Sequence, residues 1–377
     1  MQKFNIFEPT KIMKTQELIY RLALHAIKGI GPIRAKRIID QLGDTSLVFS
    51  SSKKFLKHEM GLSDQLIAEI LGYHQFNACE QELRILQNQH IKVLCHDAPN
   101  YPFLLKQCAD APALLYLNGK EEALQQPCIA VIGTRHHSDY GRRLCEEFIS
   151  ELSAHKVTIV SGLAFGIDGI AHRAALKQQL PTYGVLAHGL KELYPPSHSG
   201  LSKEMQAQGG LLTEYSFFTK ASREYFPARN RIVAGMCSAT VIIETDIRGG
   251  SMITADLAYS YNREVFCFPG RADDRKSAGC NYLIKNLKAQ LITSANDVIE
   301  ALGWKEKPRK NIQRSLFVDF NVDERSVVDQ LQQSTPLHYD ELCLRSGLHT
   351  SHLSNVLLHL ELQGIVEIKP GKMVGLV

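Results

Sequence analysis

Nine short apolar runs, separated by stretches with helical periodicity, occupy residues 91–303 and constrain the fold more than any other feature. They are Lys92–Leu94, Ala113–Leu117, Ile129–Ile132, Thr158–Val160, Thr182–Leu186, Leu211–Thr213, Thr240–Ile243, Val265–Phe268 and Gln290–Ile292. A strand, loop and helix repeated this often is typical of a largely parallel sheet with helices on both faces. We therefore predict an α/β fold with a doubly wound, mostly parallel Rossmann-like sheet over residues 89–303.

The segments on either side of this region predict two smaller domains and a linker. Residues 1–88 have helical periodicity and predict an all-helical domain similar to SAM or helix-hairpin-helix domains. Its turn at Gly29–Gly31 fits either a plain helical turn or a phosphate-binding turn, and we favour a structural or auxiliary role. Residues 304–320 are polar and basic and predict a linker. Residues 321–377 predict three helices and a hairpin, which is the outline of a winged helix.

The winged-helix pattern suggests duplex binding, but the charges of this domain argue against it. The expected recognition helix, Thr350–Gln363, contains no Lys or Arg, and acidic side chains outnumber basic ones across the domain. Phosphate neutralisation supplies most of the affinity of a protein for duplex DNA. We therefore expect this domain, whose hairpin turns at Pro370 and Gly371, to contact protein rather than DNA.

Composition excludes several other classes of protein. The 377 residues include 43 Lys and Arg against 39 Asp and Glu, so a basic surface must be local. The nine cysteines are scattered and never in C-x-x-C spacing, which argues against a disulfide framework or zinc module and favours a reducing compartment. No run is long and apolar enough to span a bilayer. We expect a soluble, cytoplasmic protein without a metal.

The loops that follow the predicted strands should gather on one rim of the sheet, because ligands of such sheets bind beyond the carboxyl ends of the strands. These loops are Gly133–Arg135, Ser161–Gly166, Gly189, Gly249–Ser251 and Pro269–Gly270. Arg135 stands where a dinucleotide fingerprint has a second glycine, and Ser161 stands where an acidic residue would bind the ribose. NAD is therefore disfavoured, and the lack of a P-loop motif disfavours ATP. We expect no cofactor.

Asp168 precedes His172 by four residues and lies on the same helix face, which is a catalytic arrangement in some enzymes. We favour a structural interpretation, in which Asp168 accepts hydrogen bonds from free amides and His172 packs beneath the loop. No Ser or Cys with a persuasive base completes a nucleophilic set. We expect no catalytic residue.

Two further segments favour an extended phosphate ligand. The segment Arg248–Ala258 places two glycines and Ser251 at an expected helix start, where amides can hold an anion. Residues 215–231 interleave aromatic and basic side chains, and aromatic faces stack on unpaired bases while cations follow phosphates. Two alternatives stay open: several of these aromatics are core, or Arg229 and Arg231 are braces to Glu214 or Glu244.

The motifs of this chain closely resemble those of the DNA-processing protein A (DprA/Smf) family. They are YP-x-x-L at Tyr101–Leu105, VIGTR at Val131–Arg135, SGLAFGID-x-x-AH at Ser161–His172, YP at Tyr194–Pro195, EY at Glu214–Tyr215, FPARNRI at Phe226–Ile232, GGSMITA at Gly249–Ala255, FPG at Phe268–Gly270 and GCNYLI at Gly279–Ile284. The resemblance covers the whole central region in order. The helical N-terminus and the winged-helix-like C-terminus also match fuller members of the family.

The resemblance implies a protein that binds single-stranded DNA, protects it from nucleases and loads RecA during natural transformation, as a dimer of Rossmann-like domains. It further implies DNA contacts at Arg135, at the Ser161–Gly162 turn, at Lys220 or Arg223, and at Arg248. The complete predicted DNA-binding set is Gly133, Thr134, Arg135, Ser161, Gly162, Phe165, Gly166, Lys220, Arg223, Arg229, Asn230, Arg231, Arg248, Gly250 and Ser251. Gly249 departs from the family, which often has serine there, although Ser251 still offers a hydroxyl.

Two other functions remain as alternatives. A phosphoribohydrolase similar to the lysine-decarboxylase-like proteins would share the sheet type and a glycine-rich anion loop, but here the stretch Arg248–Asp256 lacks the glutamate of their P-G-G-x-G-T-x-x-E motif. A duplex-binding regulator would use the C-terminal domain instead. We favour a recombination mediator that is not an enzyme.

Overall fold

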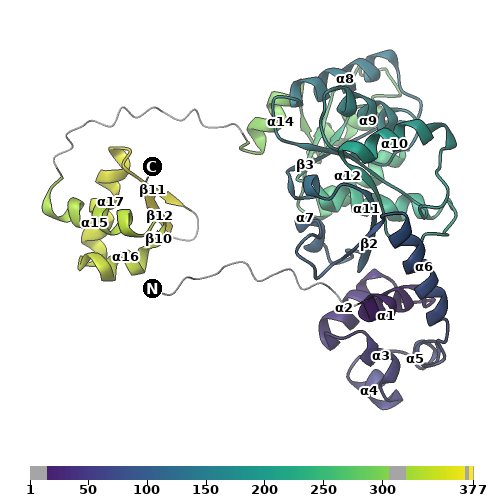
Figure 1. The fold of residues 1–377 in the computed structure, drawn as a ribbon. Helices are drawn as coiled ribbons and strands as arrows, with labels where there is room; N and C mark the ends of the chain where they lie inside the picture. The colour runs from purple at the N-terminus through teal and green to yellow at the C-terminus, as the bar shows by residue number, and fades with distance from the viewer. Residues whose placement is uncertain (1–14, 305–319, 370–372, 377) are drawn as a thin grey trace. The chain divides into compact units, whose positions relative to one another are not determined.

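The computed structural model describes residues 15–304, 320–369 and 373–376, and it divides into two units, residues 1–304 and 305–377 (Figure 1). The first unit contains a group of N-terminal helices and the α/β layers. The second is a small domain and is described by itself. Most of the predicted linker and the predicted turn at Pro370 and Gly371 lie outside the described residues.

A nine-stranded sheet forms the centre of the first unit, in the order β1-β2-β6-β5-β4-β3-β7-β8-β9. Seven strands, from β6 to β9 in that order, run parallel, and β1 and β2 pair antiparallel at one end. Every predicted run forms a strand, with its ends displaced by at most two residues. The strands are β1 Lys92–Cys95, β2 Leu114–Gly119, β3 Cys128–Ile132, β4 Thr158–Ser161, β5 Thr182–Val185, β6 Gly210–Thr213, β7 Ala239–Ile242, β8 Glu264–Cys267 and β9 Gln290–Leu291.

Helices cover both faces of this sheet, as predicted (Figure 1). Along β3, Ile129 and Val131 pack with α8, α9 and α14 on one face, whereas Ala130 and Ile132 pack with α7, α11, α12 and α13 on the other. The strands are therefore apolar on both sides, which is what a buried parallel sheet requires. The helices are α7 Phe103–Lys106, α8 Asp139–Leu152, α9 Ile167–Lys177, α10 Ser199–Gln208, α11 Tyr225–Met236, α12 Gly250–Ser260, α13 Ala278–Lys285 and α14 Ala295–Ala301, with 3-10 turns at Glu122–Gln125 and Pro196–His198.

Six short helices, coloured purple to blue in Figure 1, precede the sheet and pack against its antiparallel end. Ile19 and Leu22 of the first helix and Leu83 of the sixth share a core with Leu114 and Tyr116 of β2. Apolar packing thus joins the helical group to the sheet. The helices are α1 Thr15–Ala26, α2 Pro32–Leu42, α3 Ser46–Ser50, α4 Lys53–His58, α5 Asp64–Leu71 and α6 Phe76–Asn88.

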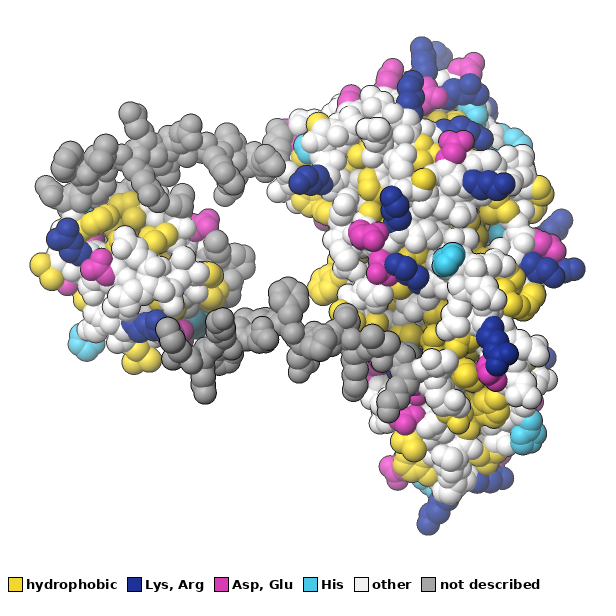
Figure 2. Space-filling view, viewed as in Figure 1, with side chains coloured by type: hydrophobic (Ala, Val, Ile, Leu, Met, Phe, Trp, Pro, Cys, Tyr) yellow, Lys and Arg dark blue, Asp and Glu magenta, His cyan; other side chains and the backbone are white. Residues whose placement is uncertain are grey.

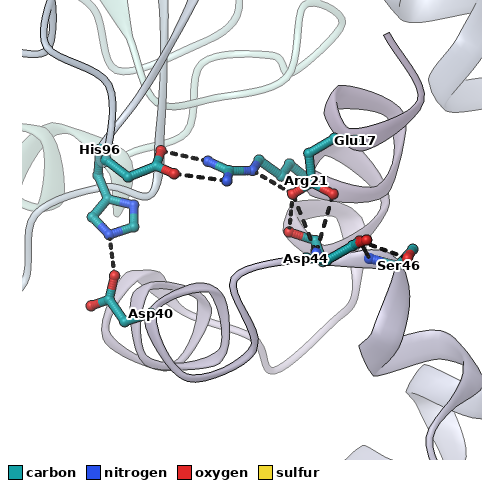
Figure 3. Close-up of polar contacts among 8 residues, drawn as sticks. Glu17, Arg21, Asp40, Asp44, Ser46 and His96 are labelled. Atoms are coloured by element: carbon teal, nitrogen blue, oxygen red, sulfur yellow. Dashed lines mark hydrogen bonds and ion pairs between the residues drawn. The ribbon is translucent and has the colours of Figure 1, made fainter. Parts of the chain in front are cut away.

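A polar cluster around Arg21 strengthens the same junction (Figure 3). The Arg21 guanidinium, which is buried, donates to both carboxylate oxygens of Asp97 at 2.6 and 2.8 Å and to Glu17 at 2.8 Å. Glu17 also accepts hydrogen bonds from the amide and hydroxyl of Thr45. Burial alone would lower the pKa of Arg21, but these hydrogen bonds to Asp97 and Glu17 raise it above its usual value. We call Glu17, Arg21, Thr45 and Asp97 the Arg21 cluster.

The second unit has the helices and hairpin of a winged helix. Val328, Leu353, Leu357 and Val374 form part of its apolar core. The strands pair in the order β10-β12-β11, all antiparallel. Its elements are α15 Val322–Gln333, β10 Leu337–His338, α16 Tyr339–Ser346, α17 Thr350–Leu362, β11 Val366–Lys369 and β12 Met373–Leu376.

Candidate nucleic-acid interface

The loops after β3 and β4 meet at the carboxyl rim, and two glycines allow the contact. A Cβ on Gly133 would lie 2.6 Å from the Ile167 side chain, and one on Gly166 would lie 2.2 Å from the carbonyl oxygen of Thr134. Gly166 also has a positive φ of 76°, which a side chain rarely adopts. The predicted residues Gly133, Thr134 and Gly166 therefore shape the rim.

A carboxylate of the chain itself occupies the start of α8, where a dinucleotide-binding fold holds a phosphate. Glu244, which follows β7 and is 1% exposed, accepts hydrogen bonds from the amide of Ser138 at 2.8 Å and its hydroxyl at 2.6 Å. The backbone oxygen of Glu244 accepts from the Thr134 amide at 2.7 Å. A Cβ on Gly141 would lie 2.6 Å from the Glu244 carboxylate. The space of a cofactor phosphate is thus filled from inside.

Asp168 and His172 form no hydrogen bond with each other, and the predicted role of Asp168 as an acceptor for backbone amides is confirmed. The Asp168 carboxylate accepts hydrogen bonds from the amides of Gly162 and Ala164, at 3.1 and 3.4 Å. Burial raises the pKa of Asp168, although the nearby Arg229 lowers it. Because the Thr182 hydroxyl donates to a carbonyl, His172 Nδ1 must donate to that hydroxyl, at 2.7 Å. Asp168 therefore holds the loop after β4, whereas His172 holds the start of β5.

Arg229 points into the protein rather than toward solvent. It is 3% exposed, and its guanidinium donates to the carbonyl oxygens of Gly162, at 2.6 Å, and Val185. Its Nε donates to the side chain of Asn230 at 3.2 Å. Burial lowers the pKa of Arg229 to about 10, and the Asp168 carboxylate opposes that shift. These contacts brace the loops after β4 and β5, although not through the glutamates that we considered.

Arg231 forms the brace that the sequence left open. Its guanidinium pairs with the Glu214 carboxylate, and both side chains are largely buried. Burial raises the pKa of Glu214, whereas Arg231 lowers it. Direct contact of either Arg229 or Arg231 with DNA stays a prediction.

Arg135 is exposed and lies over an aromatic ring. Its guanidinium carbon is 5.4 Å from the centre of the Phe226 ring, within the range of a cation–π contact. The Phe226 ring packs edge-on against Tyr194, whose exposed fraction is 45%. These three side chains come from the loops after β3 and β5 and from α11. The sequence identified each residue in a motif, but it did not show that they stack together.

Three more of the predicted cations, Lys220, Arg223 and Arg248, are exposed. On the face drawn in Figure 2, basic and acidic side chains are interspersed, which agrees with a basic surface that is local. Acidic neighbours also limit the positive charge of the rim, since Arg275 forms an ion pair with Asp246 at 2.7 Å.

The remaining predicted residues divide by exposure. Phe165 is 45% exposed and Gly250 is exposed, whereas Ser161 and Ser251 are buried. The Ser161 hydroxyl donates to the carbonyl of Val131 at 2.7 Å, and that of Ser251 donates to the Thr245 hydroxyl at 2.6 Å. Both hydroxyls are thus committed to hydrogen bonds within the rim.

No cluster of metal-binding side chains occurs within the described parts of the chain. None of the helices described there is long and apolar enough to cross a membrane. All nine cysteines are free, and eight are buried.

Comparison with known proteins agrees with this arrangement. Residues 92–303 match the family described as DNA recombination-mediator protein A, and residues 321–372 match the DprA winged helix domain. Protein Smf of Synechocystis sp. is 35% identical over 295 residues, which are 77% of this chain and 74% of that protein. Protein Smf of Escherichia coli is 34% identical over 307 residues, or 79% and 80% of the two chains.

Two solved structures are similar as well. DNA processing protein A from Streptococcus pneumoniae has a TM-score of 0.67 at 30% identity, over 75% of this chain and 97% of that one. DNA processing protein A from Helicobacter pylori, described for its single-stranded DNA binding mode, has a TM-score of 0.52 at 30% identity, over 57% and 96%. The chain therefore belongs to the DprA/Smf family of DNA recombination-mediator proteins.

Proposed function

We propose that this chain binds single-stranded DNA along the carboxyl rim of its sheet, protects the strand and loads RecA onto it during natural transformation. The observation that carries the proposal is the exposed Arg135 guanidinium over the Phe226 ring, which packs edge-on against Tyr194. Cations beside accessible aromatic faces suit a flexible strand, whose phosphates and unpaired bases both need partners. The binding needs no chemical step.

The starts of the rim helices support the same proposal. Glu244 fills the loop before α8, and Ser138 caps that helix through its hydroxyl. By contrast α12 begins after Gly249 without a side-chain hydrogen bond at its cap, and a Cβ on Gly250 would meet nothing within 4 Å. Open amides at a helix start beside the exposed Arg248 offer a place for a backbone phosphate.

The nucleotide-acting enzyme is less favoured by the contacts of Glu244. A general base must reach a substrate, and this carboxylate is buried and engaged with Ser138. Incubation with adenosine monophosphate discriminates the two functions. Base release that is lost in Glu244→Gln would support the enzyme instead.

We also propose that the chain dimerises through the edge of the sheet at which β9 lies. β9 is the terminal strand of the sheet and is only two residues long. Leu291 of β9 is exposed, as are Tyr282 and Leu287 in the preceding segment, and the exposed fraction of Leu287 is 88%. Exposed apolar side chains along an open edge are typical of an interface between chains. The free thiols fit the reducing cytoplasm in which RecA acts.

Replacing Arg135 with alanine tests the proposal. We expect affinity for oligothymidylate to fall about tenfold and the salt slope to flatten by about 0.7, the loss of one phosphate contact on a single strand. Fluorescence anisotropy across a salt series measures both quantities. Lys54→Ala, which removes an exposed charge from the helical group, is the matched control. Unchanged affinity and slope in Arg135→Ala would contradict the proposed site.

A further inference from the structure

A cavity of about 400 Å³ lies beside the rim, and its lining comes from several separate elements. Arg142 comes from α8, Arg173 from α9, and Phe165 from the loop between β4 and α9. His137 and His198 complete the part of the lining that can contact an anion or a ring. Pockets of this size hold small organic molecules rather than a single ion.

The side chains of the two arginines are not engaged with other groups of the chain. Within the described residues, neither the Arg142 nor the Arg173 guanidinium forms a hydrogen bond or an ion pair, and both residues are exposed. By contrast Arg231, Arg275 and Arg21 are each paired with a carboxylate. Two unpaired guanidinium groups in the lining of one cavity suit a phosphate, since the guanidinium fork matches its oxygens.

A base, unlike a phosphate, needs a flat apolar surface, and Phe165 provides one in the same cavity. Its ring is 45% exposed and packs edge-on against His198, with 5.6 Å between the ring centres. His198 is buried, and its Nδ1 donates to the carbonyl of Leu163 at 3.1 Å, which fixes the ring that supports Phe165. A supported aromatic ring with an accessible face is a stacking surface for a base.

The cavity adjoins the loop after β3, which carries Arg135. Gly166, which lines it, packs so closely on the loop after β3 that a Cβ would lie 2.6 Å from the Arg135 backbone oxygen. The Arg135 side chain leaves in the direction of Phe226. The lining of the cavity thus contacts the loop that carries Arg135.

We propose that this cavity binds one nucleotide, with its base on Phe165 and its phosphate between Arg142 and Arg173. The inference rests on the proposed function and adds a discrete subsite to it. Glu146, an acidic residue of the lining, disfavours a di- or triphosphate, because further negative charge would lie against a carboxylate. This nucleotide is either part of the bound strand or a free mononucleotide. Both present a base and a phosphate to the cavity.

The double variant Arg142→Ala/Arg173→Ala tests the subsite. We expect about tenfold weaker binding of long oligothymidylates and a salt slope flatter by about 0.7. In a length series, the affinity should reach its plateau one nucleotide earlier than in the wild type. Arg143→Ala is the matched control, because it removes an exposed arginine of α8 that does not line the cavity. Unchanged affinity and an unchanged plateau in the double variant overturn the inference.

Photo-crosslinking keeps the test independent of any change in folding. An oligonucleotide with 4-thiothymidine should form an adduct on the wild-type peptide that contains Phe165, and excess thymidine monophosphate should not compete if the strand is the source. Competition at micromolar concentration assigns the cavity to a free nucleotide. Absence of any adduct on that peptide overturns the subsite. If Arg135→Ala still weakens binding, the proposed function stands without it.

Discussion

At the scale of single residues, the sequence identified the rim but not the direction in which its side chains point. Arg229 was grouped with exposed cations, yet it lies inside. A signal was present: Ile232, Val233 and Met236 follow it by three, four and seven residues, so all four share one helix face. The basic residues close to Arg229 in the sequence made this helical periodicity harder to recognise. The contacts of Glu244 had no comparable signal, because they depend on how β7 meets the loop after β3.

Protonation of His172 gives a prediction at this scale. Burial, together with smaller contributions from His198, Arg229 and Arg173, lowers the pKa of His172 from its ordinary 6.5 to about 3. Between these values the unfolded chain binds a proton that the folded chain does not. The free energy of unfolding therefore falls with decreasing pH, by up to about 1.4 kcal/mol per pH unit.

The measurement compares His172→Gln with the wild type in urea unfolding at pH 7.5 and pH 5. The variant lacks the titrating ring, so its loss of stability over this range should be smaller by about 2 kcal/mol. Asn230→Ala, which keeps the histidine, should retain the wild-type dependence on pH. Parallel pH profiles for His172→Gln and the wild type would show that the ring does not stay neutral in the fold.

At the scale of elements, the sequence predicted which segments form strands but not the order of those strands in the sheet. Short runs such as Val131 and its neighbours are apolar on both sides of the strand, which is a local property of the chain. The position of β6 between β2 and β5 is not local, because strand order depends on which helices pack across which strands. The Arg21 cluster was also missed, because its members are spread along the sequence from Glu17 to Asp97 and none of them is unusual by itself.

The Arg21 cluster provides the prediction for the junction of α1 with the loop after β1. Arg21→Ala leaves the carboxylates of Asp97 and Glu17 without their cation, so we expect the free energy of unfolding to fall by about 3 kcal/mol. Arg84→Ala removes one member of an exposed pair with Glu80 and should cost less than about 1 kcal/mol. Chemical denaturation measures both values. Equal effects of the two variants would mean that the cluster adds no stability to the junction.

At the scale of the whole molecule, the proposed DNA contacts are distributed unevenly between the two units. All proposed DNA contacts lie in residues 1–304, whereas α17 of the second unit has no Lys or Arg among its residues Thr350–Leu362. That helix exposes Leu358 and Leu362 instead. Because a duplex-binding helix needs cations for phosphates, these surfaces fit contact with protein better than contact with DNA.

Truncation after Trp304 tests this division. The shortened chain should bind oligothymidylate within about twofold of the wild type, because no proposed phosphate contact is removed. It should also elute as a dimer in gel filtration, since the exposed edge at β9 is retained. A mobility-shift assay with single-stranded and duplex probes provides the comparison. Loss of all DNA binding on truncation would favour the duplex-binding regulator.

The Glu244 carboxylate at the start of α8 has a consequence for energetics. Many proteins that hand DNA from one partner to another couple release to hydrolysis of a nucleotide, and the amides at such a helix start are where its phosphates would bind. Here the chain itself supplies acceptors for the amides of Ser138 and Gly141. Under the proposed function, the strand dissociates reversibly without hydrolysis, so the direction of transfer is set by relative affinities and concentrations.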